Sequence, residues 1–92
     1  MSRGSAAQLQ PPHYPATRPE LVTLTTALHG LMHDADARRA WVSDPAGYAA
    51  RFELTEVQRA ALVAMDRAAL LAMGVHPLVP FLAAMQIERE TR

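Results

Sequence analysis

Hydrophobic residues recur at helical spacing along most of this chain. After Thr17 the first such stripe contains four leucines and a methionine: Leu21, Leu24, Leu28, Leu31 and Met32. Spacings of three and four residues place these side chains on one face of a helix. Thr17 suits the cap of that helix, and Pro19 and Glu20 suit its first turn. The pattern therefore predicts one long helix that begins near residue 17.

Two shorter helices are predicted next. The first spans Asp36 to Val42, and its inner face carries Ala37, Ala40 and Trp41. The second is capped by Asp44 with Pro45 at its first position, an arrangement typical of helix starts. Tyr48 and Phe52 lie four residues apart, so they share one side of this helix.

Further capping signals mark a fourth and a fifth helix. Thr55 followed three residues later by Gln58 forms a capping box, which predicts a helix running to residue 64 or 65. Asp66 is suited to cap the fifth helix. Gly74 is suited to end it, because glycine readily adopts the left-handed conformation that closes a helix.

A sixth helix is predicted to start at His76 and Pro77. Its apolar stripe is Leu78, Phe81, Leu82 and Met85. The alternation typical of strands is absent throughout the sequence. We therefore expect an all-α fold, a compact bundle of about five to six short helices within residues 18–92.

Residues 1–17 form a proline-rich segment that we expect to be a flexible, extended arm. Pro11, Pro12 and Pro15 restrict the backbone, and the residue before each is disfavoured in helices. One interpretation is a disordered tail. The other is an arm that orders on a partner, with Tyr14 as its anchor.

Composition narrows the possible functions. The 92 residues suit one small domain, and nine basic and nine acidic residues give zero net charge. Without a basic stripe the sequence does not predict nucleic-acid binding. It has no cysteine, no apolar run of membrane-spanning length and no signal-peptide pattern, so we expect a soluble cytoplasmic protein that does not bind membranes. All basic residues are arginines and alanine is abundant, which favours a bacterial source with a GC-rich genome.

The sequence offers little chemistry of its own. His29 and His33 are four residues apart on the first helix, a spacing that can bind a metal when further ligands join. The HExxH pattern is absent, and the simpler interpretation is two partly exposed polar residues near a helix end. Asp34 and Asp36 are interpreted as caps, and Ser43 has no assignable base. We therefore assign no catalytic, cofactor-binding or metal residue to this chain.

The segment from Arg38 to Met85 resembles the small, alpha (LigA-type) subunit family of extradiol ring-cleavage dioxygenases such as protocatechuate 4,5-dioxygenase. The resemblance covers roughly residues 19–87 and depends on the order and spacing of several motifs. These are Arg39-Ala40-Trp41, Asp44-Pro45, Tyr48, Phe52, Leu54-Thr55, Ala60-Ala61-Leu62, Asp66, Leu70-Leu71-Ala72 and Gly74-Val75-His76-Pro77-Leu78.

This resemblance implies a helical accessory subunit. In such enzymes the large beta subunit holds a non-haem Fe(II) through two histidines and one carboxylate, and it cleaves a catechol ring beside the two hydroxyls. The small subunit packs over that site as a lid. The present chain would then carry no iron and would form a hetero-oligomer with the large subunit. Alpha subunits of this family extend past the last helix, whereas this sequence ends at Arg92.

A second function class is a helical docking domain for another enzyme. Similar short domains resemble the recognition segment of ribosomally made peptide precursors, which docks on a modifying methyltransferase. Such a precursor carries a modifiable core after its helices, and residues 86–92 are short and charged for that purpose. Self-association through exposed apolar surface is a further possibility.

The candidate lid of the partner's active site lies at the turn before the last helix. The residues predicted to face the partner are Gly74, Val75, His76, Pro77, Leu78 and Phe81. The alternative is structural: His76 as a helix cap, Pro77 as a first helical residue and Phe81 as core. We expect the remaining aromatic side chains to belong to the core rather than to a binding surface, namely Trp41, Tyr48 and Phe52.

Overall fold

The computed structural model describes residues 19–91, and within this range it contains helices and no strand. The elements in chain order are η1 (Pro19–Leu21), α2 (Val22–His33), α3 (Ala35–Ser43), α4 (Pro45–Ala49), α5 (Glu56–Ala64), α6 (Arg67–Met73) and α7 (Leu78–Glu90). The predicted all-α bundle is thereby confirmed. The predicted arm of residues 1–17 lies outside the described residues.

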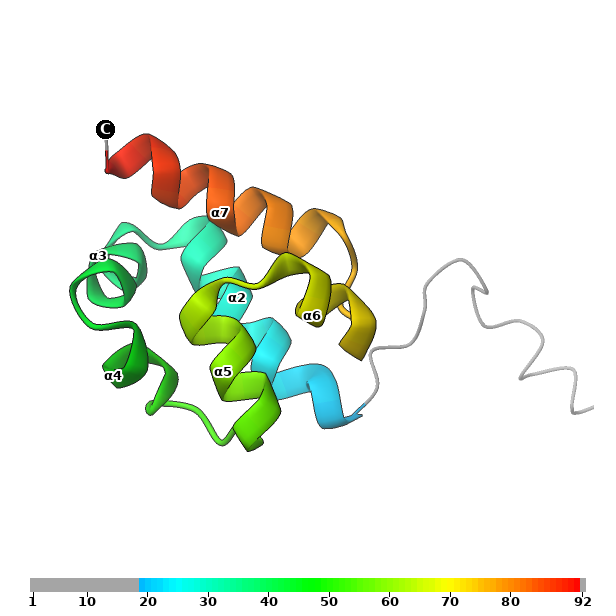
Figure 1. The fold of residues 1–92 in the computed structure, drawn as a ribbon. Coiled ribbons are helices and arrows are strands. Elements are labelled where there is room, and N and C mark those ends of the chain that lie inside the picture. The colour runs from blue at the N-terminus through cyan, green and yellow to red at the C-terminus, as the bar shows by residue number, and fades with distance from the viewer. Residues whose placement is uncertain (1–18, 92) are drawn as a thin grey trace, which may run out of the picture.

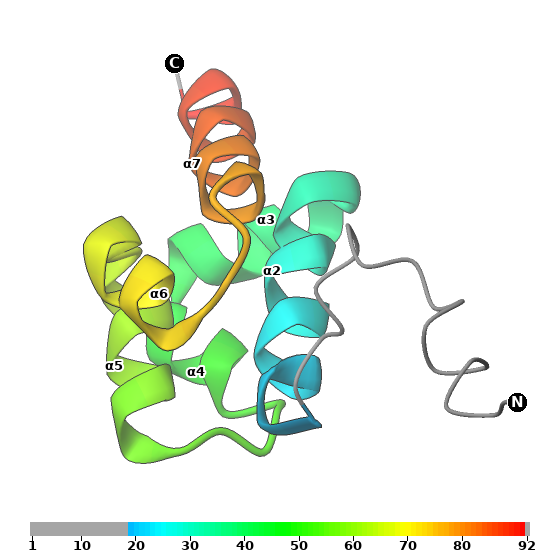
Figure 2. The ribbon, with the colours of Figure 1, turned by 90° about the vertical axis from the view of Figure 1, so that its right-hand side faces the viewer.

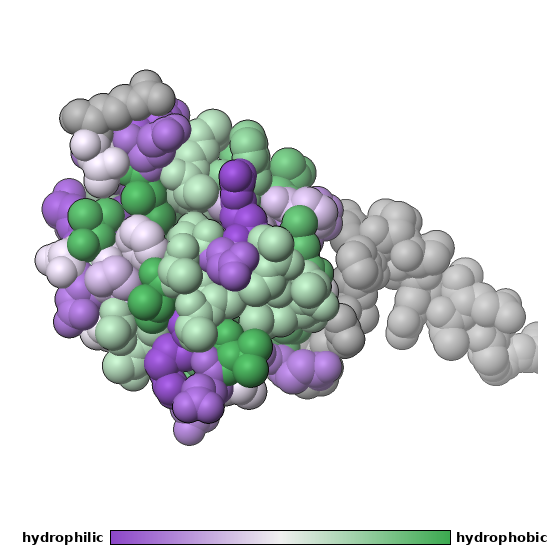
Figure 3. Space-filling model, in the orientation of Figure 1, coloured by the Kyte–Doolittle hydropathy of each residue, from purple (hydrophilic) through white to green (hydrophobic). Residues whose placement is uncertain are grey.

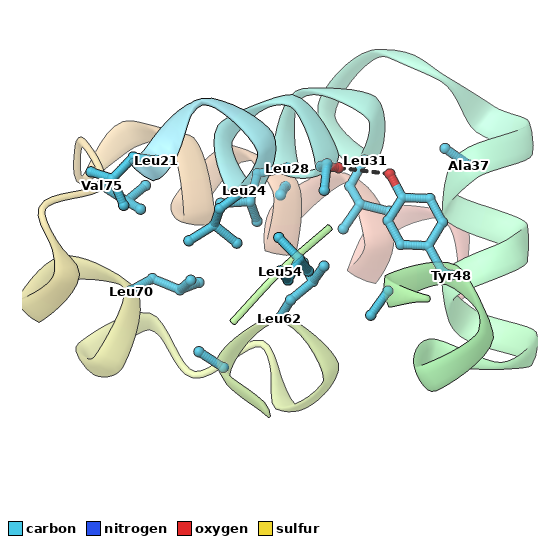
Figure 4. Close-up of a cluster of buried hydrophobic side chains, with 14 of the residues drawn as sticks. Leu21, Leu24, Leu28, Leu31, Ala37, Tyr48, Leu54, Leu62, Leu70 and Val75 are labelled. Atoms are coloured by element: carbon cyan, nitrogen blue, oxygen red, sulfur yellow. Dashed lines mark hydrogen bonds between the residues drawn. The ribbon is translucent and has the colours of Figure 1, made fainter. Parts of the chain in front are cut away.

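Helix α2 is the centre of the bundle, because it packs against α3, α5 and α7. Its predicted apolar stripe is buried, and Leu24, Leu28 and Leu31 have no exposed surface. Figure 4 shows these side chains pointing toward Leu62 of α5 and Leu70 of α6. Helix α7 lies along α2 in both ribbon views (Figures 1 and 2). Each fully buried leucine stabilises the fold by about 1.5–3 kcal/mol relative to an exposed one.

Helix α5 begins with the capping box that its sequence predicts. The Thr55 hydroxyl accepts a hydrogen bond from the Gln58 backbone N–H at 3.1 Å, and the Gln58 side chain accepts one from the Thr55 N–H at 3.0 Å. The buried Gln58 amide also donates to the Glu20 backbone oxygen at 2.8 Å. One side chain therefore caps α5 and connects it to the start of the described chain.

The predicted starts of α4 and α6 and the predicted end of α6 are also present, whereas α2 begins at Val22 after the η1 turn rather than near residue 17, and α7 begins at Leu78 rather than at His76 or Pro77. The Asp44 carboxylate accepts a hydrogen bond from the Gly47 N–H at 3.0 Å, and the Asp66 carboxylate accepts one from the Ala69 N–H at 3.1 Å. A Cβ at position 47 would lie 2.4 Å from a carboxylate oxygen of Asp44, so glycine makes room for this cap. Gly74 has φ of 106°, the left-handed conformation expected at the end of α6.

The start of the second predicted helix was wrong by one residue. Helix α3 begins at Ala35 rather than Asp36, because the side chain of Asp34 caps it by accepting a hydrogen bond from the Asp36 N–H at 2.9 Å. An aspartate has the same capping chemistry at either position. The sequence alone therefore does not decide between them.

The predicted apolar stripe of the last helix, Leu78, Phe81, Leu82 and Met85, is not its buried face. Instead, Leu78 is 55% exposed and Phe81 is 47% exposed, while Leu82 and Met85 are half-buried. The buried residues of α7 are Pro80, Ala83 and Ile87. This face packs along α2, with Ala83 fully buried between the helices.

Of the aromatic side chains predicted for the core, Tyr48 of α4 is buried, and Trp41 of α3 and Phe52 are partly buried against it. Phe52 lies beyond the end of α4 at Ala49, so the predicted helix is shorter than expected. The Tyr48 hydroxyl donates to the Ala27 backbone oxygen of α2 at 2.7 Å, the bond drawn in Figure 4. A Cβ at Gly30 would lie 2.7 Å from this hydroxyl, so glycine on α2 leaves the space that Tyr48 occupies. Burial raises the pKa of Tyr48 above its ordinary value; nearby Arg51 opposes the shift and Asp34 adds to it.

The Phe52 ring lies edge-on to the Tyr48 ring at 5.3 Å between centroids. Two more side chains, those of Trp41 and Arg38, join separate helices. The Trp41 indole donates to the Leu62 backbone oxygen of α5 at 3.0 Å. Arg38 donates to the Leu31 backbone oxygen at 3.0 Å and forms an ion pair with Glu90. The ends of α2, α3 and α7 are therefore held together by a largely buried guanidinium.

No helix within residues 19–91 has the length and apolar character needed to cross a bilayer.

Candidate partner interface

The turn between α6 and α7 is fixed to the core by Val75. This side chain is only 4% exposed and lies beside Leu21 in Figure 4. The Val75 N–H donates to the Leu70 backbone oxygen at 3.1 Å, and the preceding Gly74 N–H donates to the Leu71 oxygen at 3.0 Å. Val75 therefore cannot face a partner as predicted. Its burial in the core holds the turn in position.

His76 is exposed, and its ring takes part in helix capping. Its Nδ1 atom accepts a hydrogen bond from the Leu78 backbone N–H at 3.1 Å, which satisfies a free donor of the first turn of α7. The helix cap itself is Pro77, which is also exposed. The structural interpretation of His76 is supported, since the ring caps the helix from one residue earlier. Its exposure leaves the other ring nitrogen accessible.

An open apolar groove of about 590 Å³ lies between α6 and the start of α7. Its lining residues are Arg67, Ala68, Leu71, Pro77, Leu78, Pro80 and Phe81. Three of these carry large exposed apolar side chains, with exposed fractions of 43% for Leu71, 55% for Leu78 and 47% for Phe81. Apolar surface of this kind often marks a site of protein association.

The apolar surface continues on the other side of α6. A second groove of about 500 Å³ lies between α5 and α6; it is lined by four alanines, by Val57, which is 67% exposed, and by the acidic residues Glu56 and Asp66. Helix α6 thus separates the groove beside α7 from the groove beside α5. Figure 3 shows this side of the molecule, where apolar residues cover much of the surface around a narrow hydrophilic projection. Figure 2 shows the connection from α6 up to α7 from the side.

The histidines of α2 do not form part of this surface. The rings of His29 and His33 are exposed and lie edge-on at 6.1 Å between centroids. Between residues 19 and 91, no three His, Asp or Glu side chains come together as potential metal ligands.

Comparison with known protein families gives one match. Residues 24–87 match the family described as the aromatic-ring-opening dioxygenase LigAB, LigA subunit. The chain belongs to the LigA subunit family. The match runs from α2 into α7, so it includes the bundle core, the α6–α7 turn and both walls of the apolar groove. Searches of curated proteins and of solved structures give no match.

LigA membership makes this chain a small subunit of an aromatic ring-opening dioxygenase. It confirms the family that the capping motifs indicated. Five of the six predicted lid residues reach the surface, and three of them line the groove: Pro77, Leu78 and Phe81. The assignment of these residues to a lid stays a prediction.

Sequence reasoning missed the α6 wall of the groove. Leu70 is fully buried and Leu71 is 43% exposed, because adjacent residues on a helix point about 100° apart. The consecutive leucines were a signal that could have revealed this surface, since a short helix on a small core buries only one of them. Arg67 had no comparable signal.

Proposed function

We propose that this LigA-family chain is a non-catalytic subunit that packs on the large catalytic subunit and caps its active site. The observation that carries the proposal is the position of the exposed apolar groove within the segment that matches the LigA family. On this proposal the large subunit holds the Fe(II) and cleaves a catechol-type ring. The present chain supplies shape and apolar surface.

The geometry of the α6–α7 turn supports a capping role. Gly74, His76 and Pro77 project at the surface, while Val75 anchors the turn to the core. A fixed corner loses little conformational entropy on binding, which favours association. The rim of an active site needs such a rigid cover to exclude water. We also place the complex in the cytoplasm of a bacterium, from the cysteine-free, arginine- and alanine-rich composition.

The first experiment is co-expression with the large subunit of a ring-opening dioxygenase from the same organism. We expect the two chains to co-elute in size-exclusion chromatography, and we expect Fe(II)-dependent oxygen uptake with a catechol substrate to be faster in the complex. Separate elution, with full activity of the large subunit alone, would reject the subunit role. Capture of a peptide-modifying methyltransferase in its place would favour the docking-domain alternative.

The second experiment tests the lid residues inside the complex. His76→Ala removes the ring, and His76→Asn is the matched control because its amide oxygen can still cap α7. If the ring faces the substrate pocket, both variants change kcat or KM. If His76 serves only as a cap, His76→Asn behaves like the wild type. Unchanged kinetics in both variants would rule out the lid role of His76.

A further inference from the structure

The groove between α6 and α7 combines an apolar floor with a single charge. Among its lining residues only Arg67 is charged, and its neighbours Leu71 and Phe81 expose 43% and 47% of their side chains. A partner that fills this groove must therefore supply an apolar side chain. It must also leave the guanidinium either in water or opposite a carboxylate.

Arg67, like Arg89, lacks the partners that other arginines of the described chain have. Arg38 pairs with Glu90, Arg39 pairs with Asp36, and Arg51 lies over the Tyr48 ring. For Arg67 no ion pair or hydrogen bond exists within residues 19–91.

The position of Arg67 is also unfavourable for α6 itself. It is the first residue of the helix, where the macrodipole disfavours a positive charge. Helix stability therefore does not explain an arginine here. A negatively charged partner beside the groove would offset this cost.

Charge also distinguishes between the segments that could fill the groove between α6 and α7. The chain's own segment 1–18 contains Arg3 and Arg18 and no aspartate or glutamate, so it does not complement Arg67. The large subunit of the proposed complex is free to supply both required groups. Helix α6 and the anchored turn already fix the two walls of the groove, so binding needs no large rearrangement.

We propose that this groove is the docking site for a segment of the large dioxygenase subunit in which an apolar side chain is adjacent to an aspartate or glutamate. The inference rests on the proposed function and adds the chemistry of recognition to it. The apolar side chain enters between Leu71 and Phe81, and the carboxylate pairs with Arg67 at the rim. Arginine suits this role because its guanidinium binds a carboxylate through two hydrogen bonds.

Titration of the full-length chain against the large subunit, by calorimetry at low and high salt, tests this inference. The double variant Leu71→Ala/Phe81→Ala should raise Kd about tenfold or more, because truncated apolar anchors at the centre of an interface have large effects. Val22→Ala is its control, since Val22 is 50% exposed on α2 and outside the groove. Its Kd should stay within about twofold of the wild type.

The charge is tested separately with Arg67→Gln, which preserves the fold because the side chain is exposed. Its Kd should rise about two- to fivefold, and the dependence of Kd on salt should become shallower. Arg89→Gln, which removes the same charge in the last turn of α7, should keep the wild-type salt dependence. Circular dichroism verifies that every variant is folded.

Each other outcome overturns a defined statement. If the wild type binds and both groove variants bind equally well, the groove is not the docking site, while the proposed function stands. If only the apolar variant weakens binding, the acidic character of the partner is wrong. If the wild type does not bind the large subunit, the proposed function and the inference both fail. If the isolated chain dimerises and Leu71→Ala/Phe81→Ala abolishes the dimer, a second copy is the occupant.

Discussion

The surroundings of α2 and the corner between α6 and α7 use apolar residues in opposite ways. Around α2, leucines are fully buried. The side chains of Tyr48, Trp41 and Arg38 donate hydrogen bonds to backbone oxygens there. At the corner, large apolar side chains stay at the surface. Only Leu70, Val75 and Pro80 of that corner are buried.

On the proposed function, this difference separates the residues that fold the chain from those that bind its partner. The first region contains the contacts that define the bundle. The second has the right residues for a core but no covering element within the described chain. Substitutions should therefore change the free energy of unfolding strongly in the first region and little in the second.

The largest expected difference is between Leu28→Ala and Phe81→Ala. Leu28 has no exposed surface, so its truncation leaves a cavity and should lower the free energy of unfolding by about 2–5 kcal/mol. Phe81 is 47% exposed, and its truncation should cost less than about 1 kcal/mol. Urea unfolding of the two variants measures the contrast. A loss for Phe81→Ala as large as for Leu28→Ala would mean that the corner belongs to the core.

The second prediction concerns the contact between Gly30 and Tyr48. Gly30→Ala would place a Cβ 2.7 Å from the Tyr48 hydroxyl, so we expect a cost of about 1–3 kcal/mol despite the better helix propensity of alanine. Tyr48→Phe removes the hydrogen bond to Ala27 and should cost about 1 kcal/mol.

A double-mutant cycle supplies the control for this pair. Because Tyr48→Phe also removes the clashing oxygen, the combined variant should be less destabilised than the sum of the single changes. Thermal or urea unfolding of the four proteins gives the coupling energy. Simple additivity would show that the two side chains do not interact as the structure places them.

The smallest expected effect is a pH dependence of stability that arises from Tyr48 and is absent at neutral pH. Burial raises the pKa of Tyr48, so the folded chain holds the phenolic proton more tightly than the unfolded chain does. Stability is then constant below the unfolded tyrosine pKa of about 10 and falls as the pH rises above it toward the folded pKa. The urea midpoint should show this fall in the wild type and a smaller one in Tyr48→Phe. Equal profiles would mean that Tyr48 ionises alike in both states.

The sequence predicted well what depends on neighbouring residues. The stripe of α2, the caps at Asp44, Asp66 and Gly74, and the box formed by Thr55 with Gln58 all appear as expected. These features need only a helical period or a side chain that reaches its own backbone. For that reason they can be predicted from a single sequence.

It predicted poorly what depends on distant segments. The bond from Gln58 to Glu20 spans 38 residues and the pair of Arg38 with Glu90 spans 52, so neither has a local signal. Helix α7 has apolar residues on more than one face, and its packing against α2 decides which of them are buried. The spacing of Leu78, Phe81, Leu82 and Met85 alone did not reveal that choice.

The most direct test of the account is hydrogen exchange of the chain alone and in complex with the large subunit. We predict slower exchange on binding at residues 67–81, which include α6, the turn and the start of α7, at the shortest labelling times. Residues 35–49, on α3 and α4, should exchange as in the free chain. Protection confined to residues 35–49, or no protection in a complex that forms, would contradict the assignment of function to the α6–α7 corner.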